Sequence, residues 1–263
     1  MTCLQSPVTS RSFFSPAHRT QSGFTLVEIM VAMAIGLVMV AGILQVSAAN
    51  KESSRLQRNM GFVQENIRSA MELLARDIRQ AGYYEDDNPA ARILTPPAPF
   101  VAVSASTTDT SSAITADGGG ENNDQITITY ESNLDCLGQA TPVVGGNRFA
   151  INHFFIRNQR LMCQGNGAAA AEPLVEGVES MQILYGENTD GDPRSANRYV
   201  RPDQVANINN VVSVRLGLRF ISREAVRPTT DSNQYALLDA AAFHASDRLL
   251  RREITTTISL RNE

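Results

Sequence analysis

A continuous apolar stretch from Phe24 to Leu44 contains a single charged residue, Glu28. As a helix rising 1.5 Å per residue it would be about 31 Å long, which matches the hydrocarbon core of a bilayer. A carboxylate in such a segment costs about 2.5–3.5 kcal/mol on insertion scales at mid-membrane, so chance explains it poorly. The stretch therefore predicts a transmembrane helix in which the acid has a function of its own.

Two other interpretations explain the stretch less well. A plain single-pass anchor gains nothing from Glu28. A cleaved secretory signal would use Arg11 and Arg19 as its basic region and Val46-Ser47-Ala48 as its cleavage site. However, the apolar region of such a signal usually spans about 7–15 residues, and this one is longer and contains an acid. The helical pattern also continues beyond Ala49, which a discarded peptide does not require.

Gly23 precedes the apolar stretch, and Phe24-Thr25-Leu26-Val27-Glu28 opens it. With the short basic leader, this motif resembles the type IV prepilin signal. The resemblance implies that prepilin peptidase cuts between Gly23 and Phe24, that Phe24 is then N-methylated, and that Glu28 serves filament docking. A carboxylate buried in a bilayer or an apolar filament core requires a cation, and the nearest candidate is the Phe24 amine of a neighbouring subunit.

From Gln45 to Gly82 the pattern becomes amphipathic. Apolar residues recur at steps of three and four, while charged residues, Asp77 among them, occupy the other faces. Gly82 is suited to end the helix. Because nothing interrupts the pattern between Leu44 and Gln57, one continuous helix is expected. The apolar positions are Leu56, Met60, Val63, Ile67, Met71, Leu74 and Ile78.

Short β segments follow a region rich in Pro, Ser, Thr and Gly. Alternating apolar and polar residues mark these strands, and a hairpin is predicted to turn at Asn158-Gln159. Strands with few helices between them predict an α+β fold, in which the long N-terminal helix packs on a mostly antiparallel β-sheet head. The predicted strands are 125–130, 148–157, 160–164, 179–185, 212–220 and 254–260.

Three further segments carry a more specific resemblance. The helix end, 77–83, is similar both to the PilW family of minor pilins and to the J-type pseudopilins of type II secretion. The segment 176–199, at its stretches 176–186, 190–192 and 197–199, and the segment 255–262 resemble PilW in particular. The resemblance implies a pilin-like minor pilin that primes assembly of the type IV pilus and is incorporated into it, with roles in twitching motility and adhesion. A J-type pseudopilin or a tip-located adhesin is the alternative. Gln45 stands where many major pilins have a helix-breaking proline.

The predicted division of the chain is a prepilin leader (1–23), a transmembrane half of the helix (24–44), an amphipathic half (45–82), a loop-rich connection (83–124) and a β-sheet head domain (125–263).

Charge and topology indicate the compartment and the partners. The net charge of −4 becomes −6 without the leader, so the acidic body argues against nucleic acid as a partner. Because Arg11 and Arg19 precede the helix, the N-terminus is expected in the cytoplasm and the head in the periplasm. The protein should therefore start in the inner membrane and later enter the extracellular pilus. The expected partners are prepilin peptidase, other minor pilins, the major pilin and the inner membrane.

The leader also separates the three cysteines. Cys3 would be removed with it, which leaves Cys136 and Cys163 as an even pair in an oxidising compartment. A disulfide between them would contribute about 3–4 kcal/mol in the chain-entropy model. Metal binding is the alternative for two cysteines, but neither a CxxC spacing nor an adjacent histidine supports it.

One segment has the ligand spacing of a calcium loop, with oxygen donors at Asn188, Asp190 and Asp192. Pro193, however, occupies the position of the glycine in an EF-hand, and Tyr199 that of its bidentate Glu. A solvated acidic turn is therefore the preferred interpretation.

The other polar residues predict no catalytic centre. His153 lies in a predicted strand, and His244 lies in a segment predicted as a short helix. There is no Ser/His/Asp or Cys/His constellation and no phosphate-binding loop. The sequence thus predicts neither an enzyme nor a cofactor or metal site.

Overall fold

The computed structural model describes residues 23–83, 123–144, 146–167, 170–191, 195–205 and 207–260. The predicted leader before Gly23, most of the predicted loop-rich connection and Asp192 lie outside these ranges. The chain divides into two compact units, 1–51 and 52–263, and each is described in its own right.

Helix α1 runs without interruption from Leu26 to Gln80, as the sequence predicts. Its end is also the predicted one, because Gly82 has a φ of 75°, in the left-handed region that glycine tolerates. The Gly82 N–H donates to the Thr129 carbonyl oxygen at 2.8 Å. The end of the helix is thereby fastened to the sheet that follows it in the chain.

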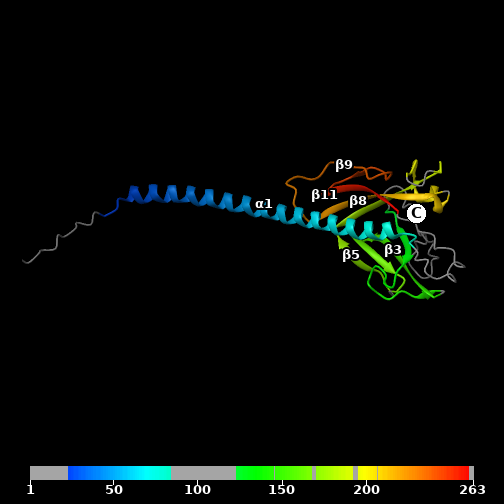
Figure 1. Cartoon of the computed structure of the whole chain (residues 1–263). Coiled ribbons are helices and arrows are strands. Elements are labelled where there is room, and N and C mark those ends of the chain that lie inside the picture. Colours follow the sequence, from blue (N-terminus) through cyan, green and yellow to red (C-terminus); the bar gives the residue numbers. More distant parts are fainter. Residues whose placement is uncertain are drawn as a thin grey trace, which may run out of the picture. The chain divides into compact units, whose positions relative to one another are not determined.

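The second unit contains the strands, all of them in antiparallel pairs (Figure 1). Their bounds are β1 (Ile126–Glu131), β2 (Val143–Val144), β3 (Asn147–Arg157), β4 (Arg160–Gly165), β5 (Glu172–Glu176), β6 (Val178–Glu187), β7 (Arg198–Val200), β8 (Val211–Ala225), β9 (Gln234–Tyr235), β10 (Phe243–His244) and β11 (Leu249–Ser259). A five-stranded sheet has the order β1–β3–β4–β5, with β2 also paired to β3. A four-stranded sheet has the order β11–β8–β6–β7, and β9 pairs with β10. The predicted class, a long N-terminal helix with an antiparallel β head, is confirmed.

The predicted hairpin lies between β3 and β4. Asn158 and Gln159 have φ values of 51° and 59°, and Arg157 pairs with Arg160 across the turn. Two consecutive left-handed residues form the turn type whose twist matches that of paired strands.

The strands form two main sheets, where the sequence predicts one. The chain passes between them at Gly177, the residue between β5 and β6, whose φ is +70°. A Cβ at this position would lie 2.9 Å from the Ile221 carbonyl oxygen and 3.1 Å from a ring carbon of Phe62. Only glycine suits both that conformation and that space.

The core is formed where the C-terminal part of α1 meets strands of both sheets. Of the apolar helix positions, Val63, Leu74 and Ile78 are buried, whereas Leu56 is exposed. The largest fully buried side chains are Tyr185, Phe154, Phe220, Leu74, Ile78, Ile126, Ile128, Leu161, Met181, Ile183, Leu216 and Leu218.

The prediction that Asp77 lies on an exposed helix face is wrong. Its side chain is fully buried. Asp77 follows Ala70 and Leu74 at steps of four and three, so it belongs to the face that packs on the head. The charge of the side chain suggested an exposed face, whereas its position in the helix places it on the packed one.

The polar face of β8 is also more covered than a half-buried strand would be. The segment between β8 and β11 lies over it, and a Cβ at Gly217 would be 3.0 Å from Leu238 and 3.1 Å from Leu237. Arg219, which alternates with apolar residues in the sequence, is buried. His244 lies in β10, so the short helix predicted there is absent.

Candidate assembly site at the start of the helix

Thr25 caps the N-terminus of α1. The Glu28 N–H donates to the Thr25 hydroxyl oxygen at 3.3 Å, and the Ile29 N–H donates to the Thr25 carbonyl oxygen at 3.2 Å. Thr25 and Glu28 therefore have the Thr-x-x-Glu spacing of a capping box. Gly23 and Phe24 precede the helix, which leaves the peptide bond between them in non-helical backbone.

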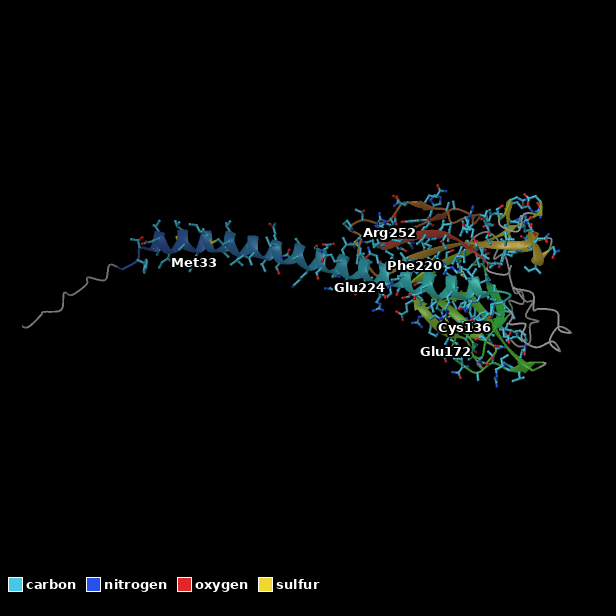
Figure 2. The ribbon with its side chains drawn as sticks, viewed as in Figure 1. Met33, Cys136, Glu172, Phe220, Glu224 and Arg252 are labelled. Atoms are coloured by element: carbon cyan, nitrogen blue, oxygen red, sulfur yellow. A yellow bond between two sulfur atoms is a disulfide. The ribbon has the colours of Figure 1, made fainter. Side chains whose placement is uncertain are left out.

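The helix that follows this cap exposes apolar side chains on every side. Phe24 is 79% exposed and Leu37 is 71% exposed. Figure 2 shows Met33 projecting from the helix, and its side chain is 65% exposed. An 18-residue window of α1 has a mean hydropathy of 2.5 and no buried residue, which gives the helix the length and composition of a membrane span. A helix that is apolar all round requires lipid or other apolar protein around it.

Glu28 lies in the first turn of this helix. A negative charge there is stabilised by the partial positive charge of the helix N-terminus. Within the part of the chain that the structure describes, no ion pair involves the Glu28 carboxylate. The first turn thus presents a carboxylate on an apolar helix, and within the described residues this carboxylate has no cationic partner.

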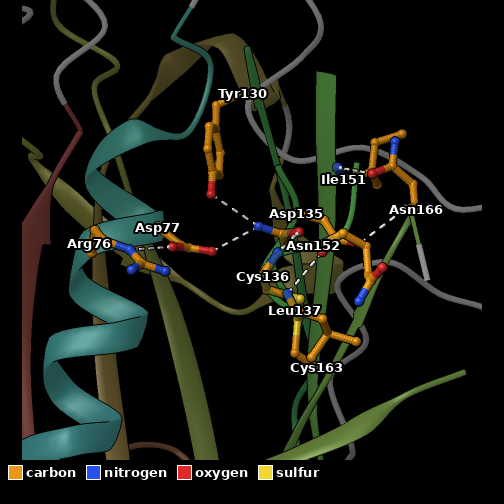
Figure 3. The surroundings of a disulfide bond; sticks show 12 residues. Arg76, Asp77, Tyr130, Asp135, Cys136, Leu137, Ile151, Asn152, Cys163 and Asn166 are labelled. Atoms are coloured by element: carbon orange, nitrogen blue, oxygen red, sulfur yellow. Dashed lines mark hydrogen bonds and ion pairs between the residues drawn. A yellow bond between two sulfur atoms is a disulfide. The ribbon is translucent and has the colours of Figure 1, made fainter. Parts of the chain in front are cut away.

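In the head, the predicted disulfide between Cys136 and Cys163 is present, with the two Cα atoms 6.6 Å apart (Figure 3). It joins the loop after β1 to β4. The neighbouring Asp135 carboxylate orders the same loop, because it accepts hydrogen bonds from the N–H groups of Leu137 and Gln139 at 2.9 Å and of Gly167 at 3.0 Å.

A buried polar group, which the sequence pattern does not predict, connects this loop to the helix. Figure 3 shows Asp77, Tyr130 and Asn152 converging beside the disulfide. The Asn152 amide donates to the Asp77 carboxylate at 2.9 Å and to the Tyr130 hydroxyl at 3.1 Å. Burial raises the pKa of Asp77, although the Arg76 charge and the Asn152 hydrogen bond oppose that shift. Burial, followed by the Asp77 charge, also raises the pKa of Tyr130.

A second charge cluster, also not anticipated from sequence, joins β6 to β11 across β8. The Arg251 guanidinium lies 2.8 Å from the Glu179 carboxylate and 2.7 Å from that of Asp247. The Arg251 hydrogen bonds hold the pKa of Asp247 below its usual value. Because the Arg251 guanidinium is buried, loss of its carboxylate partners would be costly, so this cluster holds β6 and β11 together.

The segment with the spacing of a calcium loop forms a turn that is stabilised by its own side chains. The Asn188 amide oxygen accepts the N–H of Asp190 at 3.1 Å and that of Gly191 at 2.9 Å. Across the described ranges, no three His, Cys, Asp or Glu side chains gather in a way that could hold a metal ion. His153 accepts or donates one hydrogen bond with Gln125, and burial lowers its pKa.

Comparison with known proteins gives matches at both ends of the chain. A family model described as Type IV Pilus-assembly protein W (PilW) matches residues 148–262, and one described as the prokaryotic N-terminal methylation motif matches residues 18–44. No curated protein matches. Among solved structures, the type IV-like pilin TTHA1219 from Thermus thermophilus aligns with a TM-score of 0.45 and 16% identity, over 76% of this chain and 95% of that one.

Proposed function

We propose that this chain, a type IV pilin-like structural subunit that matches the PilW family model over residues 148–262, acts as a minor pilin that primes pilus assembly and enters the filament. The observation that carries the proposal is the capped helix, which exposes an apolar surface with one acid in its first turn. A soluble globular protein would have no use for such a helix, whereas a subunit that packs its helix against others does. Pilus-dependent motility and adhesion would follow from this role.

Maturation would occur at the Gly23–Phe24 bond, cut by prepilin peptidase. Two features support this. The bond precedes the helix, so its backbone is open to a protease, and the N-terminal methylation motif covers it. The new N-terminus would be Phe24, next to the capping Thr25, and its amine would be methylated.

Before it is assembled into the pilus, the subunit would be located in the inner membrane. Arg11 and Arg19 on the leader side favour a cytoplasmic N-terminus, which puts the head in the periplasm. That compartment permits the Cys136–Cys163 disulfide. Transfer into the pilus would then replace lipid by the helices of other pilins.

Glu28 would direct docking by pairing with the Phe24 amine of a neighbouring subunit. In an apolar filament core neither charge is hydrated, so an ion pair between them is strongly favoured over two unpaired charges. Loss of one partner of such a pair typically costs about 3–5 kcal/mol, which is enough to decide whether a subunit is accepted.

The test is Glu28→Ala in the full-length chain, with Glu52→Ala as a matched control on an exposed acid of the same helix. Glu28→Ala removes an intramembrane charge, so the protein should accumulate in the membrane, cleaved and disulfide-bonded, while its amount in sheared pili falls at least tenfold, about 1.4 kcal/mol. The control should enter pili normally. Normal incorporation of Glu28→Ala would contradict the docking role, and its loss from the membrane would assign Glu28 to stability.

The alternative is a J-type pseudopilin of a type II secretion system, which shares the leader, the helix and the motif at its end. The family model over 148–262 favours the pilus, because it covers the head and carries a pilus-assembly description. Deletion of the gene should therefore reduce surface pili and leave protein secretion unchanged.

A further inference from the structure

Asn152 is a fully buried amide in β3 with a partner for each side of its side chain. Its nitrogen donates to Asp77 at 2.9 Å and to Tyr130 at 3.1 Å, and its oxygen accepts the Cys136 backbone N–H at 2.9 Å. Rotating the amide by half a turn would break the hydrogen bonds to Asp77 and Cys136, because it would set the amide oxygen against a carboxylate oxygen and the NH2 group against a backbone N–H. Its orientation is therefore fixed by its neighbours.

The acceptor side of this amide depends on the disulfide. Cys136 lies in the loop that the disulfide ties to Cys163 in β4, beside β3. The bond thus keeps the Cys136 N–H in place over Asn152. Without it, the loop would keep only hydrogen bonds to its neighbours, such as the one from the Gly167 N–H, just after β4, to the Asp135 carboxylate.

The donor side of the amide supports the helix. Asp77 is the buried acid in the last turns of α1, and its other carboxylate oxygen receives the Arg76 guanidinium at 3.1 Å. A buried carboxylate that loses a hydrogen-bond donor becomes costly to keep inside. The end of the helix therefore packs stably on the sheet only when the Asn152 NH2 group points toward Asp77.

We propose that Asn152 couples the Cys136–Cys163 disulfide to the docking of the end of α1, so that closing the loop and seating the helix form one cooperative unit. The disulfide then stabilises the C-terminal end of α1 as well as its own loop. This coupling is independent of the proposed function, because it concerns the fold of the head alone.

Hydrogen exchange of the full-length chain in detergent micelles tests the coupling. In the wild type, reduction of the disulfide should speed exchange of the amides at 74–80 by about fivefold, within the range known for residues of one hydrogen-bond network. In Asn152→Ala these amides should already exchange faster, and reduction should add little. The matched control is Asn166→Ala, which breaks two hydrogen bonds to the same strand, at Phe149 and Ile151, away from the helix. It should keep the full response to reduction.

Two results would overturn the proposal: exchange of the helix amides that does not change on reduction in the wild type, or an unchanged response in Asn152→Ala.

A reciprocal measurement tests the coupling if Asn152→Ala does not fold, because coupling between two sites acts equally in both directions. Asp77→Ala should make the disulfide about fivefold easier to reduce with dithiothreitol, whereas Glu72→Ala, at an exposed acid of the same helix, should not. Equal behaviour of the two variants would refute the coupling.

Discussion

Several polar side chains of the head are buried with defined partners, and their types alone gave a misleading picture of where they lie. Asn59 is buried in α1, where its oxygen accepts the Glu224 N–H at 3.1 Å. Asp77 is buried about five turns further along the same helix and depends on Asn152. Helical spacing could have placed Asp77 on the packed face, because Ala70 and Leu74 precede it at the right steps. Its partner could not be found from sequence, since Asn152 is 75 residues away.

Because the pKa of Asp77 is raised, the free energy of unfolding should depend on pH. Because its folded-state pKa lies above the unfolded value of 3.8, the folded chain holds this proton to higher pH than the unfolded chain does. The free energy of unfolding should therefore fall as pH rises from about 3.8 through the folded-state pKa. Asp77→Asn cannot ionise and should lack this loss.

Urea titrations of both proteins between about pH 3.5 and pH 7.5 check this. The difference in unfolding free energy should move in favour of Asp77→Asn as the pH increases. Asp231 and Asp247, whose pKa values are lowered, act in the opposite direction but are common to both proteins and cancel in the difference. Parallel pH profiles would show that Asp77 titrates normally.

Among the elements, those with local signals were predicted well. The end of the helix at Gly82 and the hairpin turn at Asn158-Gln159 both depend on residues within a few positions, and the structure confirms both. The passage from one sheet to the other at Gly177 was missed, because it depends on Phe62 and Ile221, which are distant in sequence. The segment that covers the polar face of β8 was missed for the same reason.

The disulfide is the element whose removal should be easiest to measure. The Cys136→Ser, Cys163→Ser double variant should lower the free energy of unfolding of the head by about 3 kcal/mol, because the open chain regains the entropy of the loop. Cys3→Ser, in the proposed leader, is the control and should leave the stability of the head unchanged. Equal stability of wild type and double variant would mean that the hydrogen bonds of the loop, those of Asp135 among them, hold it without the disulfide.

At the scale of the whole molecule, the chain combines an exposed apolar helix with a separately packed head. The family matches fall on both parts, with the methylation motif at 18–44 and the PilW model at 148–262. The sequence already indicated the first part, since a run of apolar residues with one acid is visible without tertiary contacts. The cap at Thr25 adds that this acid begins the helix and is not buried within it.

Mass spectrometry of the N-terminus of the chain recovered from sheared pili tests the central claim most directly. The chain should be present in purified pili and should begin with N-methylated Phe24. A chain that is absent from pili, or that begins at Met1 or near Ala49, would contradict it.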